Sequence, residues 1–307
     1  MTYGIIIHYG LYSYYGYDNV KSAMKRKIQN GSEWYYGRLI DNNKFRPISG
    51  SDFTKQYHFA KHNNINYFDN IDKITNDENK IKNWIRIAKQ NKATYIILTS
   101  KHHDGVCLWN TNTDSKKSHL NLLEIFANEC ESENIDFGFY YSWFEFGKPF
   151  TLKYFEDYCV KQLNEIIEFG PKYLWFDGDW MITQKKIITE IKQNIIPNIK
   201  SKGIIINDRI GVKDNDYSLC DYRVFEDRFI PNKKLNIKWQ HINTIGYSWG
   251  FNKEQKEDDY KNGIEIYNLY KKVIELEGDF LINLGPDIDG NIIDKELEAI
   301  KYLSTKI

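Results

Sequence analysis

Short apolar runs alternate along this chain with longer segments whose apolar residues recur every three or four positions. The run 94–99 (TYIILT) is typical of a buried strand, whereas 78–91 (ENKIKNWIRIAKQN) carries its apolar side chains at helical spacing. Both patterns recur to the end of the chain. The predicted strands span residues 4–9, 94–99, 136–142, 172–177, 203–207, 222–226, 237–243 and 279–284. The predicted helices span about 78–91, 119–132, 151–168, 184–199, 254–277 and 293–304, with Pro197 expected to end or kink the fourth.

This alternation is typical of a parallel sheet, and 307 residues is the length of a single (β/α)8 TIM-like barrel. The irregular segment 11–77 is expected to form loops and short helices over one face of the barrel. A doubly wound sheet is the alternative fold, but it would need a glycine-rich phosphate loop, and neither GxGxxG nor GxxxxGK[ST] occurs. Because no linker or repeat interrupts the pattern, we predict one α/β domain covering residues 1–307.

One acidic residue stands at the end of the most aromatic predicted strand. In the stretch 172–180 (KYLWFDGDW), the apolar run stops at Asp177, and the glycine that follows favours a turn. Asp177 should therefore lie where a core strand meets a loop, flanked by Trp175 and Trp180. Taken alone, such an Asp-Gly pair more often holds a turn than performs chemistry.

Polar side chains stand near the ends of most of the other predicted strands. These residues are His8, His102, His103, Asp104, Tyr141, Asp177, Arg209, Glu226, Gln240 and His241. In a parallel barrel the carboxyl ends of all strands meet at one mouth, where active sites are built. Each residue has a structural explanation by itself, but desolvating so many polar groups together is costly without partners or a ligand. We therefore predict a functional site at the mouth.

The chemistry that these residue types allow is hydrolysis of a sugar bond. One carboxylate would attack the anomeric carbon and a second would act as general acid and then base. The aromatic content of 16% fits flat apolar faces that pack on a sugar. A metal hydrolase is the competing chemistry. However, adjacent His102 and His103 would not both easily face one ion from a strand, because successive side chains alternate sides, and neither HxH nor HExxH occurs. We therefore predict no metal and no other cofactor.

Charge and composition argue against several classes of partner. Lys plus Arg and Asp plus Glu both number 42, so the formal net charge is zero and no broad basic surface for nucleic acid or anionic membrane is expected. No apolar run approaches 18 residues, and no signal-peptide pattern opens the chain. The four scattered cysteines fit free thiols in a reducing compartment. We expect a soluble, cytoplasmic protein, and the sequence predicts no oligomeric state.

Taken together, these stretches resemble the retaining α-L-fucosidases of glycoside hydrolase family 29. The matching segments occur in the family's order and span nearly the whole chain. They are GIIIHYGLYS (4–13), EWY (33–35), LTSKHHDGVCLWN (98–110), FYYS (139–142), GPKYLWFDGDW (170–180), INDR (206–209), SWGFN (248–252) and LINLGPDIDG (281–290).

The resemblance implies roles for individual residues. Asp177 matches the catalytic nucleophile, and the substrate would be a fucosylated oligosaccharide or glycoconjugate. The fucose-binding positions would be His8, Glu33, Trp34, His102, His103, Tyr141, Trp175, Arg209 and Trp249. The family's barrel is usually followed by a β-sandwich. Because the chain stops after its last predicted helix, we expect the sandwich to be absent.

One departure from the family concerns the acid/base. Many members have a glutamate in a Lys-Trp-Glu run, and here the run is Lys238-Trp239-Gln240. Glutamine cannot transfer a proton, and loss of a general acid costs on the order of a hundred- to ten-thousandfold in rate. Either Glu226 supplies the acid/base, which we favour, or the protein is a catalytically impaired, lectin-like fucose binder.

Overall fold

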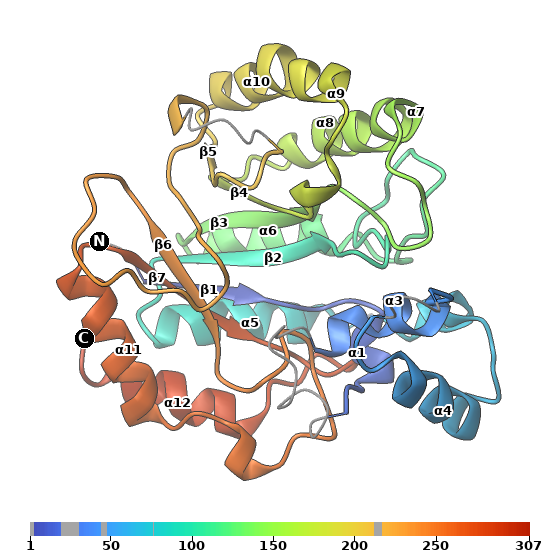
Figure 1. The fold of residues 1–307 in the computed structure, drawn as a ribbon. Helices are drawn as coiled ribbons and strands as arrows, with labels where there is room; N and C mark the ends of the chain where they lie inside the picture. The colour runs from blue at the N-terminus through green and yellow to red at the C-terminus, as the bar shows by residue number, and fades with distance from the viewer. Residues whose placement is uncertain (1–2, 20–30, 44–47, 76, 212–216) are drawn as a thin grey trace.

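Seven parallel strands form the centre of the structure, a computed structural model that describes residues 3–19, 31–43, 48–75, 77–211 and 217–307 (Figure 1). The strands are β1 (Tyr3–Ile7), β2 (Tyr95–Lys101), β3 (Asp136–Ser142), β4 (Tyr173–Asp177), β5 (Ile205–Ile206), β6 (Gln240–Thr244) and β7 (Asp279–Leu284). Their order across the sheet is β5-β4-β3-β2-β1-β7-β6, and each neighbouring pair is parallel. Parallel neighbours need crossover connections, most of which contain helices here. The α/β organisation predicted from the sequence is therefore present.

The predicted eighth strand, 222–226, is reduced to two isolated bridges between the edges of the sheet. Tyr222 pairs in parallel with Asn207, just after β5, and Arg223 pairs in parallel with Trp239, just before β6. The next amide, that of Val224, donates instead to the Asp208 carboxylate at 2.8 Å. This side-chain acceptor replaces the main-chain partner that a longer strand would need. The sheet is therefore curled and barrel-like, with regular strands at seven positions of the described residues.

Helices flank the sheet and extend from one of its ends. They are α1 (Tyr12–Tyr15), α3 (Tyr35–Ile40), α4 (Ser51–His62), α5 (Glu78–Gln90), α6 (Leu122–Ser132), α7 (Leu152–Tyr154), α8 (Lys161–Ile167), α9 (Lys185–Glu190), α10 (Ile196–Ser201), α11 (Gly263–Glu275) and α12 (Asp294–Ser304). Short 3-10 turns occur at Ser32–Trp34 and Tyr67–Lys73. In Figure 1, α3 and α4 lie side by side, apart from the helices that flank the sheet. The described parts of the segment 11–77 thus consist of loops and short helices, as expected, and residues 20–30, 44–47 and 76 lie outside the described residues.

Two predicted helices differ in detail. The helix predicted over 254–277 begins at Gly263, because the Asn262 side chain accepts hydrogen bonds from the amides of Ile264 and Glu265, and Glu265 bonds back to the Asn262 amide. This capping box fixes the start of α11. The helix predicted over 184–199 continues to Ser201, with a π-helical segment at Ile191–Ile195 just before Pro197. Pro197 has no N–H to donate within the helix, and the wider π-helical turn before it lets the helix continue past the proline.

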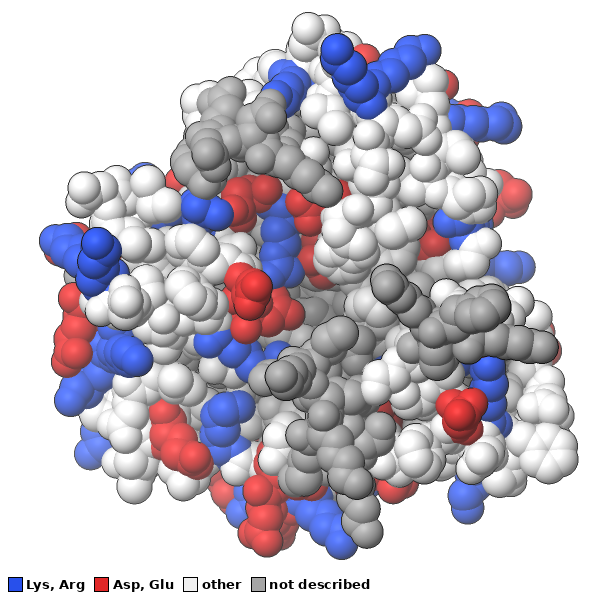
Figure 2. All heavy atoms as spheres, viewed as in Figure 1, with Lys and Arg blue, Asp and Glu red and all other residues white. Residues whose placement is uncertain are grey.

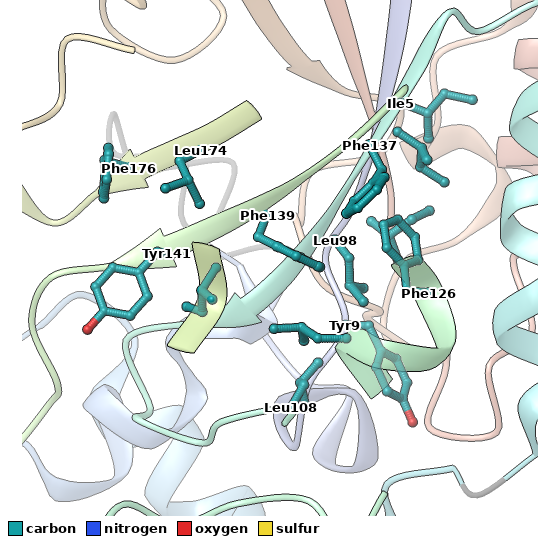
Figure 3. Close-up of a cluster of buried hydrophobic side chains, with 14 of the residues drawn as sticks. Ile5, Tyr9, Leu98, Leu108, Phe126, Phe137, Phe139, Tyr141, Leu174 and Phe176 are labelled. Atoms are coloured by element: carbon teal, nitrogen blue, oxygen red, sulfur yellow. The ribbon is translucent and has the colours of Figure 1, made fainter. Parts of the chain in front are cut away.

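Side chains alternate along each strand between two hydrophobic cores. The inner core, enclosed by the curled sheet, contains Ile6, Tyr95, Ile97, Tyr140, Trp175, Tyr222, Val224, Ile242, Trp249 and Leu281. The outer core lies between the sheet and its helices, and Figure 3 shows Phe137, Phe139 and Tyr141 of β3 with Leu174 and Phe176 of β4 in it. Residues i and i+2 of one strand therefore share an environment.

Two glycines make room for large rings in the inner core. A Cβ on Gly4 would lie 2.2 Å from the Tyr95 ring, and one on Gly138 would lie 2.6 Å from Cβ of Tyr173. The rings of Tyr95 and Tyr173 pack against each other with centroids 4.8 Å apart. These rings fill the amino-terminal end of the enclosed space and leave the opposite end for polar groups.

Charged side chains are mixed in sign over the face shown in Figure 2, with no broad field of either sign. This distribution fits the equal numbers of acidic and basic residues in the sequence. Among the described residues, no helix combines the length and the apolar character needed to cross a membrane.

A buried carboxyl outside the cavity gives the fold a testable pH dependence. Burial raises the pKa of Glu296 on α12 from 4.5 to about 8, against the single hydrogen bond that the Gly285 amide donates to it at 3.0 Å. Because the folded-state pKa lies above the unfolded one, the stabilisation from this group is complete below about pH 4.5 and is lost as the pH rises through 8.

Glu296→Gln keeps an acceptor for Gly285 and cannot ionise. We expect it to raise the unfolding free energy at pH 9 by on the order of a few kcal/mol, measured by urea denaturation.

Glu298→Gln, an exposed change on the same helix, is the matched control and should not remove the loss of stability that accompanies ionisation of Glu296. If the unfolding free energies of wild type and Glu296→Gln changed in the same way with pH, the raised pKa of Glu296 would be contradicted.

Candidate active site

A cavity of about 1030 Å³ opens at the carboxyl ends of the strands. Ten of the eleven site residues predicted from the sequence line it. They are His8, Glu33, Trp34, His102, His103, Trp175, Asp177, Arg209, Glu226 and Trp249. The other lining residues are Tyr140, Asp179, Trp180, Asp208, Arg223, Val224, Phe225, Asp227, Arg228, Phe229 and Ile242. Residues far apart in the sequence therefore meet at one mouth, as the barrel prediction requires.

The Asp177 carboxylate lies at the end of β4, and only 8% of the residue is exposed. One oxygen, Oδ1, accepts a hydrogen bond from Arg209 Nη1 at 2.9 Å. The other, Oδ2, accepts from the Tyr140 hydroxyl at 2.8 Å and lies 3.5 Å from His103 Nε2. Each carboxylate oxygen thus has one strong donor and retains lone-pair capacity toward the cavity.

These contacts decide the charge of Asp177. Burial alone would raise its pKa, but the Arg209 charge, His103 and the two hydrogen bonds together hold the pKa below its ordinary value of 3.8. Asp177 is therefore a carboxylate at neutral pH.

Arg209 connects two carboxylates across the cavity. Its Nη2 donates to Asp227 Oδ1 at 2.6 Å and to the Phe225 carbonyl at 3.1 Å, while its Nη1 holds Asp177. The guanidinium also lies 4.8 Å from the centre of the Trp175 ring, a cation–π contact. Arg209 thereby fixes Asp177 and attaches the segment 225–227 to the same site.

Three buried histidines form another wall. The rings of His102 and Tyr140 stack with centroids 5.2 Å apart, and the His8 ring lies 5.2 Å from that of Trp249. Burial lowers the pKa of His8 and of His103 to about 4, and it lowers the pKa of His102 well below its ordinary value. All three rings are therefore neutral at pH 7. Within the described residues, Nδ1 of His102 is buried and has no hydrogen-bond partner.

Glu33 ties two segments of the wall together. Its Oε1 accepts from the Gly31 amide at 2.6 Å, and its Oε2 accepts from the amides of Trp249 and Gly250 at 3.2 and 3.1 Å. Burial raises the pKa of Glu33, and the backbone N–H groups oppose that rise. The carboxyl thus holds the turn that carries Trp34 against the loop that carries Trp249.

Tyr141 does not lie in the cavity, so its predicted role is wrong, and Tyr140 takes the position. Tyr141 points into the outer core, where its hydroxyl donates to Gln162 at 2.7 Å (Figure 3). In β3 the inward positions are Gly138, Tyr140 and Ser142, because alternate residues share a face. The sequence prediction placed Tyr141 on the inward face, whereas Tyr140 is the residue that faces inward.

Gln240 is also misplaced by the prediction. It stands at the beginning of β6 rather than at its end, and it does not line the cavity. Its side chain accepts from Trp175 Nε1 at 2.9 Å and donates to the Tyr95 hydroxyl at 3.0 Å, at the closed end of the inner core. Gln240 thus holds the Trp175 ring in place from the closed end of the inner core, on the side away from the cavity opening. Its identity therefore says nothing about which carboxyl faces the open end of the cavity.

Comparison with known proteins decides the family. The sequence model of the family described as "Alpha-L-fucosidase" matches residues 1–305. The chain belongs to the alpha-L-fucosidase family. An alpha-L-fucosidase of Dictyostelium discoideum is 30% identical over 99% of this chain and 68% of its own length. One of Branchiostoma floridae is 26% identical over 95% of the chain and 65% of its own length, so the chain spans about two thirds of these relatives.

Solved structures of the family share the fold. The alpha-fucosidase of Thermotoga maritima superposes with a TM-score of 0.80 at 26% identity, covering 99% of this chain and 71% of that one. The same enzyme in complex with fucose gives a TM-score of 0.79 at 27% identity. The alpha-L-fucosidase AlfC of Lactobacillus casei shows the same fold at 20% identity and a TM-score of 0.73, and there the match covers 94% of that chain.

Other features of this fucosidase-family cavity escaped the sequence prediction. Besides Tyr140, the segment 222–229 supplies most of one wall. Arg228 shapes this segment, since it adopts a left-handed backbone (φ 65°) and its guanidinium lies 4.8 Å from the Trp249 ring centre. Tyr140 could have been found by aligning β3 with β4, where Tyr140 pairs with Trp175 and Ser142 with Asp177. No local pattern indicates the path of 222–229.

No group of three or more His, Cys, Asp or Glu side chains suited to a metal ion occurs in the part of the chain that the structure describes. The cavity combines neutral imidazoles, indole rings, the Tyr140 phenol, three arginines and several carboxylates.

The assignment of Tyr140 is tested by a pair of matched variants. Tyr140→Phe removes a hydrogen bond that lowers the pKa of Asp177, so this pKa should rise. If activity requires ionised Asp177, the acidic limb of the pH profile of kcat/KM for an aryl fucoside should move to higher pH. We also expect kcat/KM to fall by about tenfold or more, as for loss of a hydrogen bond to a charged group.

The adjacent Tyr141→Phe removes a hydrogen bond in the outer core and is the control. It should lower stability by about 1 kcal/mol and leave the acidic limb in place. Equal effects of the two variants on the pH profile would show that Tyr140 has no special position.

Proposed function

We propose that the protein is a retaining α-L-fucosidase that releases α-L-fucosyl residues by double displacement, with Asp177 as nucleophile. The observation that carries the proposal is a buried carboxylate, Asp177, that is held ionised in a cavity lined by the histidine, tryptophan and arginine side chains suited to binding a sugar. The family and the fucose complex of the Thermotoga maritima relative support the substrate class.

The contacts of Asp177 suit the first displacement. Arg209 and Tyr140 fix the orientation of the carboxylate without protonating it, so one oxygen can attack the anomeric carbon as the glycosidic bond breaks. The bond to the leaving group breaks with its electron pair, and a general acid protonates the departing oxygen. In the second displacement, water gives its proton to the same group and attacks the fucosyl–Asp177 ester. Two inversions give net retention.

Glu226 is our candidate for the acid/base. It lies exposed at the cavity, and among the described residues its carboxylate makes no hydrogen bond or ion pair. The neighbouring Asp227 is bound by Arg209 at 2.6 Å, so its carboxylate is held in that ion pair rather than free to turn toward a glycosidic oxygen. Because Glu226 is unrestrained, it can approach the glycosidic oxygen when substrate fills the cavity. Gln240 does not compete for this role, since it lies at the closed end of the inner core.

The size and rim of the cavity suit a fucosylated oligosaccharide rather than a monosaccharide. About 1030 Å³ is at the upper end of the range for ligand sites and exceeds what one hexose fills. Trp180, 44% exposed, stands at the rim with its ring 5.5 Å from that of His103. An exposed indole beside the nucleophile offers a face on which the leaving sugar can stack.

The nucleophile is tested by trapping and by product stereochemistry. A fluorinated fucoside that slows the second step should label the peptide containing Asp177, detected by mass spectrometry. Asp177→Ala should abolish hydrolysis of aryl fucosides, and added azide should give the inverted β-fucosyl azide through a single displacement. Binding without labelling would indicate a lectin-like protein, and undiminished hydrolysis by Asp177→Ala would refute the assignment.

The acid/base is tested by varying the leaving group. Glu226→Ala should lower the rate by about a hundredfold or more for fucosides with poor leaving groups and much less for dinitrophenyl fucoside. Azide should now give the retained α-fucosyl azide, because it attacks the fucosyl–enzyme ester. Asp227→Asn, one residue away, should show neither the leaving-group dependence nor the azide product, and the reverse result would exchange the two roles.

The rim is tested with substrates that differ only in their leaving group. Trp180→Ala should lower kcat/KM for a fucosyl disaccharide by about tenfold, the loss expected from an aromatic contact, and should leave fucosyl fluoride almost unaffected. Phe53→Ala, an exposed aromatic change on α4 outside the cavity, is the control. An equal loss for both substrates would place Trp180 against the fucose itself.

A further inference from the structure

Two hydrogen-bond chains end at the cavity histidines His103 and His8. In each chain the first acceptor is a main-chain carbonyl, which fixes which atom donates and which accepts in every following bond. We infer that Ser142 and Asn283 act as positioning residues that keep the ring proton of His103 and of His8 on Nδ1, so that both rings present an unprotonated Nε2 to hydroxyl groups of the sugar. The inference about the sugar rests on the proposed function, but the placement of the protons can be measured without any substrate.

The chain at His103 begins at a main-chain carbonyl. Ser142 Oγ lies 2.7 Å from the carbonyl oxygen of Phe144, which can only accept, so the serine hydroxyl donates its single proton there. The same Oγ lies 2.7 Å from His103 Nδ1 and, having no proton left, must accept. Nδ1 of His103 therefore carries the hydrogen.

The chain at His8 has the same logic with an amide in place of the hydroxyl. Asn283 lies on β7, and its Nδ2 is 2.6 Å from the carbonyl oxygen of Trp249, which can only accept. This contact fixes the orientation of the amide, so Oδ1 is the atom that faces His8 Nδ1 at 2.6 Å. An amide oxygen accepts, so Nδ1 of His8 carries the hydrogen. Asn283 thus orients His8 and the Trp249 loop together.

The consequence is sharpest beside the nucleophile. His103 Nε2 lies 3.5 Å from Asp177 Oδ2, and with the proton on Nδ1 neither atom donates to the other. Tyr140 already donates to that oxygen. The low pKa of His103, about 4, agrees with a neutral ring despite the nearby carboxylate. The gap beside His103 is therefore suited to a ligand group that donates a hydrogen bond to Nε2, and a sugar hydroxyl is such a donor.

The protons can be located by nitrogen NMR on protein labelled with ¹⁵N-histidine, without ligand and at pH 7. His8→Gln and His103→Gln assign the signals. In the wild-type protein both rings should show a protonated Nδ1 and an unprotonated Nε2. A protonated Nε2 on either ring, in a neutral or a doubly protonated imidazole, would overturn the inference.

Ser142→Ala tests the positioning role. Without its acceptor at Nδ1, His103 should shift its proton to Nε2, where Asp177 becomes the partner, and kcat/KM for an aryl fucoside should fall at least tenfold. Ser100→Ala is the matched control. Ser100 is equally buried on the adjacent strand and donates to a carbonyl at the same 2.7 Å, but it bonds no histidine. An unchanged His103 signal in Ser142→Ala, or an equal loss of activity in both variants, would refute the positioning role.

A protein that cleaves no fucoside would fail the activity tests above yet could still show both predicted ring protonation states. The failure of the proposed function and the failure of this inference are therefore distinguishable.

Discussion

The ion pair between Asp177 and Arg209 is the interaction on which the rest of the site depends. A carboxylate on a residue that is only 8% exposed would ordinarily have a raised pKa, because burial in a medium of low dielectric disfavours the charged form. The bond from Arg209 Nη1 at 2.9 Å, with that from the Tyr140 hydroxyl at 2.8 Å, reverses this tendency. Arg209 is held in turn by Asp227 and by the Trp175 ring. The site is thus a connected set of charges and dipoles rather than one isolated acid.

The alternation of side chains along parallel strands decides which residues join this set. Asp177 and Trp175 face inward from β4, whereas Leu174 and Phe176 pack outward against the helices (Figure 3). The pairing of β3 with β4 then places Tyr140 beside Trp175 and Ser142 beside Asp177. Large rings close the amino-terminal end of the enclosed space. The polar groups are therefore concentrated at the other end, where the loops leave an opening.

Much of this organisation could be predicted from the sequence, because it depends on local patterns. Strand–helix alternation predicted the sheet, and the abrupt end of an aromatic strand at Asp177 predicted where the acid stands. The errors lie where a local pattern has two solutions. Tyr140 and Tyr141 are adjacent aromatics, and only the register with β4 decides which of them faces inward. Gln240 was assigned to the end of a strand that in fact begins there. The path of 222–229 depends on distant partners such as Asp208, which captures the Val224 amide, and no local signal encodes it.

The most direct test of the central claim is a measurement of the ionisation of Asp177 itself. The carboxyl carbon of Asp177 can be followed by ¹³C NMR as the pH is varied, with Asp177→Asn used to assign the signal. Our interpretation predicts a pKa below 3.8, the ordinary value for an aspartate, in the free protein. A pKa above that value would show that burial outweighs Arg209 and Tyr140, and a nucleophile kept ionised by those two residues would be contradicted.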